Sequence, residues 1–186
     1  GNGGTDTATV TVVIVGTEDL PVAIDDSEAT DESAPVSINV LDNDFDPDGS
    51  NILQVISLTQ PTSGAFVVVN SVGVIDYDPN GNFESLAAGE SATDLFTYTI
   101  EDGNGNTDVA TVTVTLTGQN DAPSAIDDAA STNEDSPVEI DLLANDGDID
   151  STDVLTISGI TQPSSGAIVT QNVDDLHERA GSTKIL

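Results

Sequence analysis

The sequence predicts an all-β protein made of tandem β-sandwich repeats, and strand patterning, turn sequences and an internal duplication all support this class. Segments such as residues 95–100 and 111–116 alternate apolar with polar side chains, which is typical of strands with one buried face. They are rich in Thr, Val and Ile, which favour strands. Turn-forming stretches such as residues 46–49 separate them. No helical periodicity of useful length competes with this pattern.

The duplication is the clearest organisational feature. Residues 3–12 recur as residues 105–114, so the two copies are offset by 102 positions. The same offset carries the acidic segment 41–48 onto 143–150, and the match continues in one register as far as Ala167. A register kept over this length establishes a repeat of about 102 residues.

One repeat contains seven candidate strands separated by Asx, Gly and Pro turns. Seven short strands in about 100 residues predict an immunoglobulin-like β-sandwich. The expected strands are residues 22–29, 35–41, 52–59, 65–69, 73–78, 94–101 and 107–117.

The chain is expected to be an excised piece that is cut out of phase with its repeats. Residues 1–16 are interpreted as the last strand of a preceding repeat and 17–118 as one complete β-sandwich repeat. Residues 119–172 are interpreted as the first half of the next repeat, and 173–186 as an atypical tail. A half-sandwich leaves strand edges open and buries little, so we expect this half to be mobile or completed by another chain.

Acidic residues dominate the composition. There are 34 acidic and two basic residues, giving a formal net charge of −32. Both basic residues and the single histidine lie in the last ten positions. This charge excludes nucleic acids and anionic membranes as partners, and no stretch has a membrane-spanning length. High acidity with 3% aromatic residues is also compatible with disorder, but the strand patterning argues for a folded chain.

The composition also argues against catalysis. Residues 1–176 contain no Cys, His, Lys or Arg, which removes nucleophile–base pairs and zinc centres. Carboxylate pairs for glycoside hydrolysis remain possible in principle, but the acids lie in repeated turns without a recognisable cleft. We therefore predict that the chain is not an enzyme. Without disulfides, its domains must be held by their cores, by metal ions, or by both.

One acidic loop has the spacing of a cation site. Asp44, Asp46 and Asp48 match the start of an EF-hand loop, but position 12 is Val55 rather than Glu and no helix follows. Alternate acids in a tight turn can still direct several oxygens at one calcium ion, which takes six to eight. The alternative is an Asx-rich turn with solvated charges. The same triplet recurs in the second repeat, which favours metal binding: Asp146, Asp148 and Asp150.

An ordered series of motifs resembles a known family. Residues 120–128, 41–49, 75–80 and 96–105 resemble the cadherin-like and VCBS-type tandem repeats of large secreted, RTX-type bacterial surface adhesins. The resemblance covers residues 1 to about 172. It implies export by a dedicated secretion system, a cadherin-like Greek-key sandwich, calcium at the junctions between repeats, and a spacer role in adhesins. The first junction departs from the pattern, with Glu18-Asp19-Leu20-Pro21 in place of Asn-Asp-Ala-Pro.

The resemblance also implies which acids bind calcium at the junctions. In eukaryotic cadherins, which this arrangement resembles, calcium bridges a short linker to loops of both neighbouring domains. The alternative is a charged, flexible linker, although proline and a short spacer favour a stiff joint. The junction acids are Asp19, Asp25 and Asp26 in the first repeat and Asp121, Asp127 and Asp128 in the second, with Glu101, Asp102, Glu32 or Glu134 as partners.

The predicted function is therefore that of a calcium-binding extracellular stalk repeat of a bacterial surface adhesin. Its expected partners are neighbouring repeats of the same parent chain, with host surfaces, abiotic surfaces or carbohydrate bound through other domains. The alternative is a module that itself binds carbohydrate or a surface. Such sites usually carry clustered aromatic residues, and only Phe45 and Phe83 lie in loops. We expect Phe83 to fill the core instead.

Overall fold

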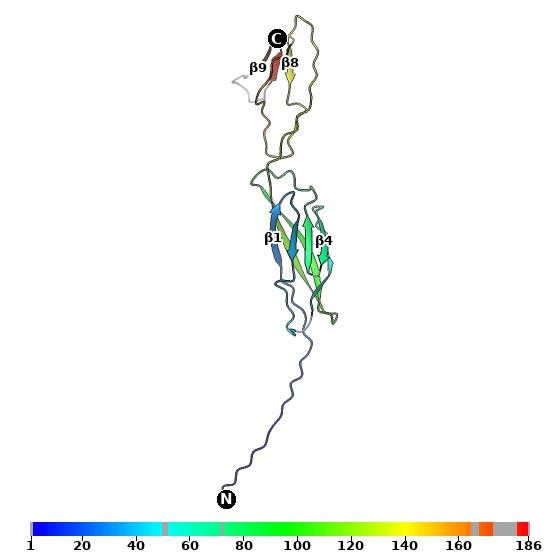
Figure 1. Ribbon diagram of the computed structural model, residues 1–186, viewed down its shortest axis with the longest axis vertical. Coiled ribbons are helices and arrows are strands. Elements are labelled where there is room, and N and C mark those ends of the chain that lie inside the picture. The colour runs from blue at the N-terminus through cyan, green and yellow to red at the C-terminus, as the bar shows by residue number, and fades with distance from the viewer. Residues whose placement is uncertain (1, 50–51, 72, 165–167, 173–181, 186) are drawn as a thin grey trace.

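The computed structural model describes residues 2–49, 52–71, 73–164, 168–172 and 182–185, which form strands and loops without a helix. No helix that could span a membrane is found in this part of the chain. Figure 1 shows three parts along the long axis: an extended N-terminal segment, a β-sandwich, and a smaller β-unit that contains the last strand.

The sandwich consists of two sheets that together contain all seven expected strands. A four-stranded sheet has the order β1-β7-β6-β3 and a three-stranded sheet has the order β2-β5-β4. The strand β1 runs parallel to β7, and the other pairs are antiparallel. The prediction of an all-β, immunoglobulin-like sandwich is confirmed. The strands are β1 (Asp26–Asp31), β2 (Val36–Asn39), β3 (Gln54–Leu58), β4 (Phe66–Ser71), β5 (Val74–Asp78), β6 (Ser91–Glu101) and β7 (Thr107–Thr117).

The core lies between the two sheets and follows the period-two patterning of β6 and β7. In β7, every second residue from Ala110 to Leu116 is buried, because alternate side chains of a strand point to the same face. Tyr77 stacks on Phe96 with ring centroids 6.4 Å apart. Phe83 packs against this core, as predicted.

A buried carboxylate anchors one tyrosine of the core. Asp94 accepts hydrogen bonds from the Tyr77 hydroxyl at 2.9 Å, from Ser63 Oγ at 2.6 Å and from the Leu95 N–H at 3.0 Å. Its burial is therefore offset by three donors. Asp94 lies on the same face of β6 as the buried Phe96 and Tyr98, because alternate side chains of a strand point to one side.

We expect Asp94→Asn to lower the free energy of unfolding by about 1–3 kcal/mol, because an amide NH₂ would face a buried donor. Urea unfolding of the full chain measures this loss. Glu28→Gln, which makes the same change at an exposed position of β1, is expected to stay within about 0.5 kcal/mol of the parent. Equal effects of the two substitutions would contradict a structural role for Asp94.

The second unit reproduces the smaller sheet of the sandwich. It contains β8 (Val138–Asp141), β9 (Val169–Asn172) and β10 (Ser182–Ile185) in the order β8-β10-β9. In the first repeat Tyr77 pairs with Val36 and Val67. In the second unit Ile185 pairs with their counterparts at the 102-residue offset, Val138 and Val169. Thus β10, from the segment whose composition breaks the repeat, takes the place of β5. Residues 173–181 of that segment lie outside the described residues.

The larger sheet has no counterpart in the described part of the second unit. Residues 128–133 and 156–160 correspond to β1 and β3 but form no strand. In the first repeat β1 pairs with β7, and β3 pairs with β6. No described strand occupies either of those partner positions in the second unit. A strand without a neighbour leaves its backbone groups unpaired, which explains why these segments stay irregular.

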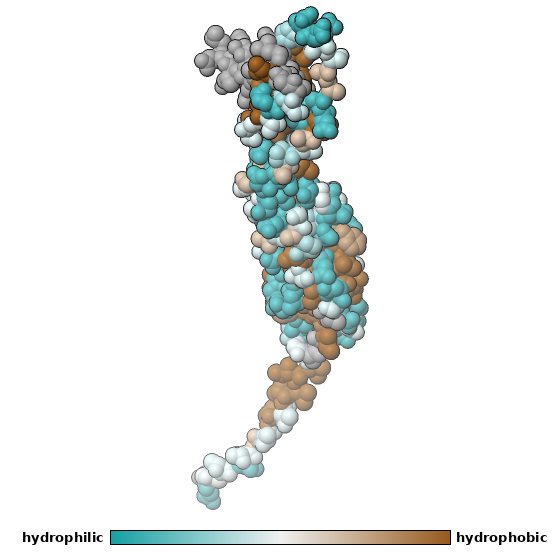
Figure 2. All heavy atoms as spheres, turned by 45° about the horizontal axis from the view of Figure 1, so that its top comes forward, coloured by the Kyte–Doolittle hydropathy of each residue, from teal (hydrophilic) through white to brown (hydrophobic). Residues whose placement is uncertain are grey.

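The N-terminal segment is extended and exposed. Residues 2–21 form no strand, so the strand expected over residues 1–16 has no partner strand here. Val10 is 84% exposed and Ile14 is 91% exposed. Figure 2 shows the corresponding apolar stretch between the sandwich and the N-terminal end.

Candidate metal sites

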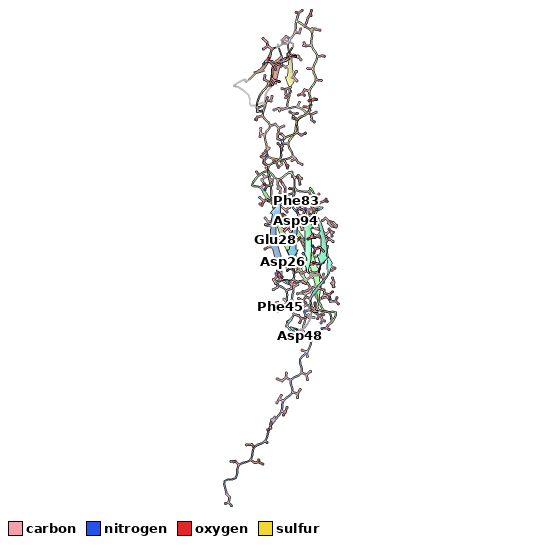
Figure 3. The ribbon with its side chains drawn as sticks, viewed as in Figure 1. Asp26, Glu28, Phe45, Asp48, Phe83 and Asp94 are labelled. Atoms are coloured by element: carbon pink, nitrogen blue, oxygen red, sulfur yellow. The ribbon has the colours of Figure 1, made fainter. Side chains whose placement is uncertain are left out.

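The acidic loop 42–49 is clamped to the linker that enters the sandwich. Val22 and Phe45 exchange two backbone hydrogen bonds, at 2.8 Å and 3.1 Å. The linker N–H of Asp19 donates to Asp48 Oδ2 at 2.7 Å, and the N–H of Asp48 donates to Asp46 Oδ1 at 2.8 Å. The Asp48 carboxylate therefore faces the linker, and so does that of Asp44, which accepts from the Ile24 N–H at 2.7 Å. Figure 3 places Phe45 and Asp48 at the end of the sandwich that the N-terminal segment enters.

The second repeat forms the same clamp. Ser124 and Gly147 exchange backbone hydrogen bonds at 2.7 Å and 3.0 Å. The N–H of Asp121 donates to Asp150 Oδ2 at 2.8 Å, and the N–H of Asp150 donates to Asp148 Oδ1 at 3.1 Å. Because the clamp forms in a unit whose described residues contain only the smaller sheet, we infer that the loop and the linker are sufficient to specify it.

Three of the predicted ligands in the first repeat are engaged by the sandwich itself. The Tyr98 hydroxyl lies 3.0 Å from Asp26 Oδ2 and 3.0 Å from Asp44 Oδ2, and Asp25 accepts from the Thr111 N–H at 2.8 Å. Burial raises the pKa of the Asp26 carboxyl, and the charge of Asp44 raises it further. Burial also raises the pKa of the Asp44 carboxyl. These acids hold the start of β1 against β6 and β7.

At the other end of the sandwich, carboxylates from both repeats meet at the joint. Glu32 directly follows β1 and is 2% exposed, and its Oε1 accepts from the linker N–H of Gln119 at 2.8 Å. Asp150, in the acidic loop of the second repeat, is also 2% exposed. Glu32 Oε2, Asp121 Oδ2 and Asp150 Oδ1 are the buried side-chain oxygens without a hydrogen-bond partner among the described residues.

Burying these carboxylates without a counter-charge destabilises the folded state, because buried carboxylate oxygens need hydrogen-bond donors or cations. Burial raises the pKa of the Glu32 carboxyl, and the nearby charges of Asp121, Glu84 and Asp150 raise it further. Coulombic repulsion of this kind shows that the carboxylates share one electrostatic environment. The donor set, which contains only oxygen, suits a hard divalent cation.

Two acids of the joint were not among the predicted ligands. Asp153 has a carboxylate oxygen within 4.8 Å of those of Asp148 and Asp150. Its counterpart at the repeat offset is Asn51, so the comparison of repeats gave no acidic match at that position. Glu84 lies beside Ser85, whose carbonyl accepts from the Ser151 N–H at 3.3 Å. This contact brings a loop of the first repeat against the second, which the linear sequence does not reveal.

Two of the other predicted partners, Asp102 and Glu101, lie at the opposite end of the sandwich, where the first linker enters. Asp102 accepts from the Asn104 N–H at 2.7 Å and from Asn106 Nδ2 at 2.7 Å. Although burial alone would raise its pKa, these hydrogen bonds lower the pKa of the Asp102 carboxyl. The side chain of Asn104 also bonds Glu18 in the entering linker. Glu101 is the last residue of β6 and lies at the end of the sandwich where the first linker enters. Three further predicted ligands belong to the second repeat and are exposed: Asp127, Asp128 and Glu134.

The fold and the repeated clamp define a bacterial immunoglobulin-like repeat, and comparison with known families agrees. The family model described as "Bacterial Ig domain" matches residues 18–115 and 120–178. The chain therefore belongs to the bacterial Ig domain family, which confirms the predicted class.

A curated relative is the calcium-binding lectin RapA2 of Rhizobium johnstonii (strain DSM 114642 / LMG 32736 / 3841). It is 33% identical over 131 residues, which cover 63% of this chain and 56% of the relative, so the chain spans little more than half of that protein. A solved structure, a nucleoside hydrolase-related hypothetical protein from Saccharophagus degradans that is associated with carbohydrate metabolism, is 16% identical with a TM-score of 0.33. That match covers 55% of this chain and 26% of the other.

Proposed function

We propose that this chain is a calcium-binding structural repeat of a secreted bacterial adhesin, and that a calcium ion at the joint stiffens successive repeats into a stalk. The observation that carries the proposal is the group of unpartnered, buried carboxylate oxygens at Glu32, Asp121 and Asp150. They come from the first repeat, the linker and the second repeat. One ion bound to all three would tie both repeats to the linker.

Calcium fits this donor set better than magnesium does. Calcium accepts six to eight oxygen ligands in flexible geometry, whereas magnesium demands a near-octahedral shell and retains several waters. Asp148 and Asp153 lie beside Asp150 and could complete the shell, with Glu84 close enough to influence Glu32. The calcium-binding name of the curated relative supports the same cation.

In the proposed mechanism, calcium restricts the orientations that one repeat can take relative to the next. Without the ion, the like charges of Glu32, Asp121 and Asp150 repel and open orientations of the joint are favoured. Binding favours the orientation that brings the carboxylates together, because the ion has higher affinity for that state. The expected partners are neighbouring repeats of the parent chain, and the expected location is the bacterial cell surface. Attachment to a host surface, an abiotic surface or carbohydrate is assigned to other domains.

Glu32→Gln in the full chain tests the joint directly. We expect isothermal titration calorimetry to show calcium affinity at the joint reduced roughly tenfold or more, since a ligand oxygen loses its charge. Glu28→Gln is the matched control, because it removes the same charge from an exposed position of β1. Unchanged calcium affinity in the Glu32 variant would contradict the proposed site.

The same pair of variants has a second readout in thermal stability. The folded-state pKa of Glu32 lies above its ordinary value of 4.5, so in chelator the ionised side chain opposes folding at pH 7. This cost vanishes as the pH falls below that ordinary value, where Glu32 is protonated in both states. Glu32→Gln should therefore raise the melting temperature in chelator at pH 7 and lower it in calcium. A shift of the same sign in both conditions would argue against calcium binding by Glu32.

A further inference from the structure

One side of the sandwich is uncharged, although the chain as a whole is strongly acidic. On this side, β4 is an edge strand of the smaller sheet and β3 is an edge strand of the larger sheet (Figure 1). Both strands lie within residues 49–75, which contain no Asp, Glu, Lys or Arg, and residues 154–173 of the second repeat are likewise uncharged. Proteins commonly protect an exposed strand edge with charged side chains or proline, so the edge of β4 requires a different protection.

The strand β4 has the composition of a strand that pairs readily with another. Residues 66–69 are Phe-Val-Val-Val, and they pair with β5 in one register before a shift at the end of the strand. Phe66 is 53% exposed and Val68 is 42% exposed. Uncharged segments of this type that contain no proline are prone to edge-to-edge association. Two chains with a net charge of −32 repel each other where their acids meet, so the uncharged edge is where two copies can approach most closely.

The side chain of Gln60 occupies the backbone hydrogen-bonding groups of this edge. Its Nε2 donates to the Val67 carbonyl at 2.9 Å, and its Oε1 accepts from the Val67 N–H at 3.1 Å. A primary amide contains both a donor and an acceptor, so Gln60 makes the two bonds that a neighbouring strand would make at Val67. Directly before β4, the Ala65 N–H donates to Ser63 Oγ at 3.1 Å. Backbone groups of alternate residues point to the same side of a strand, so both residues are covered on the edge that faces away from β5.

The chain on either side of Gln60 holds its side chain in this position. The preceding residue, Thr59, donates its N–H to the Thr97 carbonyl of β6 at 2.9 Å. The following residue, Pro61, is buried, and its ring restricts the backbone. Gln60 therefore lies where the chain leaves the larger sheet, and its side chain reaches across to the smaller sheet.

The second repeat contains the same contact. Gln162 and Val169 correspond to Gln60 and Val67 at the 102-residue offset. The Gln162 Nε2 donates to the Val169 carbonyl at 2.6 Å, and its Oε1 accepts from the Val169 N–H at 2.8 Å. Val169 begins β9, which is an edge strand in the order β8-β10-β9. Each repeat thus pairs a glutamine side chain with the edge of its smaller sheet.

We propose that the β4 edge is a docking surface for a second copy of this chain, and that Gln60 blocks it. Once the side chain is removed, the backbone groups of Val67 can pair with β4 of another copy, and main-chain hydrogen bonds supply the affinity. Both copies contribute the same surface, so the contact is isologous and closes as a dimer. Gln162 blocks the corresponding edge in the second repeat. A chain that lacks both glutamines therefore presents two open edges and assembles beyond the dimer.

Sedimentation velocity over a concentration series tests the proposal in the full chain. Relative to the parent chain, the mass of Gln60→Ala should rise with concentration and level off at twice the monomer mass. The double variant Gln60→Ala/Gln162→Ala should exceed the dimer mass. Gln54→Ala is the matched control, because it removes an exposed glutamine from β3, and it should sediment as the parent chain does.

Gln60→Glu separates edge pairing from a general loss of folding. The carboxylate keeps an acceptor for the Val67 N–H but loses the amide donor, and it places like charges on the edges of two approaching copies. We therefore expect Gln60→Glu not to dimerise, although it lacks one bond of the parent contact. Self-association of Gln60→Glu equal to that of Gln60→Ala would contradict pairing through this edge.

Hydrogen exchange at the Val67 amide, followed by NMR, locates the contact. The Val67 N–H should exchange slowly in the parent chain, faster in dilute Gln60→Ala, and slowly again at concentrations where that variant dimerises. A Gln60→Ala variant that keeps the parental mass at the highest attainable concentration would overturn the proposal. Growth of this single variant beyond the dimer would also overturn it, because an isologous edge contact closes at two copies.

Discussion

Calcium should raise the melting temperature of the full chain by about 10 °C or more relative to chelator. Ligand at a thousandfold excess over its dissociation constant stabilises a folded protein by about 4 kcal/mol per site. The two repeats contain one acidic clamp each, at Asp48 and at Asp150, and the joint adds the buried carboxylate of Glu32. Differential scanning calorimetry or circular dichroism at matched ionic strength measures the shift.

The controls separate specific binding from screening. A chain with a net charge of −32 gains stability from any salt that reduces self-repulsion. The melting temperature is therefore also measured in magnesium at the same concentration and in sodium chloride at the same ionic strength. An equal shift in all three solutions would mean that the acids form only a screened surface, and the calcium-stiffened joint would have to be abandoned.

Gly118→Ala should lower the free energy of unfolding by about 3 kcal/mol, at the upper end of overpacking effects. Gly118 follows β7, and a Cβ added there would lie 2.3 Å from the Leu86 carbonyl oxygen and 2.4 Å from that of Ala87. Both are backbone atoms, so no side-chain rotation relieves the overlap. The N–H of Gly118 also donates to the Glu90 carbonyl at 2.9 Å, which holds the strand and the loop close together.

Gly159→Ala is the matched control, because an added Cβ there meets nothing within 4 Å. Chemical unfolding in calcium compares the two variants with the parent chain. Since Gly118 leads directly into the linker, its variant is also expected to weaken calcium binding at the joint. Equal stability of the two variants would show that the loop at Leu86 moves aside without cost.

The repeat pattern was sufficient to predict the strands of the sandwich, but not all of their limits. The alternation over residues 94–101 and 107–117 predicts strands with one buried face, because the period of two is a local property of extended chains, and β6 extends three residues further toward the N-terminus, to Ser91. The expected first strand begins at residue 22, whereas β1 begins at Asp26. Residues 22–24 instead donate their N–H groups to the loop at Phe45, to Asp108 and to Asp44. Local propensity does not distinguish these partners from a strand neighbour.

The candidate metal site was likewise predicted from the sequence only in part. The acids of the repeated loop, such as Asp48 and Asp150, were identifiable because a cation site in a tight turn needs alternate carboxylates close in sequence. The resemblance grouped Asp102 with Glu32 as partners of the junction acids without saying which junction each one serves. The structure shows Asp102 bonded to Asn104 and Asn106 in a hairpin, at the end where the first linker enters.

The sequence by itself determined the repeat, the strand pattern and the alternate acids of the repeated loop, because each of these is visible in the order of residues along the chain. Only the tertiary structure decided which carboxylates meet at the joint. Glu32 lies near Asp121 and Asp150 because β1 ends beside the end of β7, where the linker begins. Glu84 lies near the same carboxylates but belongs to a separate loop. Strand order and the direction of β1 set these neighbours through long-range pairing, and long-range pairing is not encoded in the periodicity of any single segment.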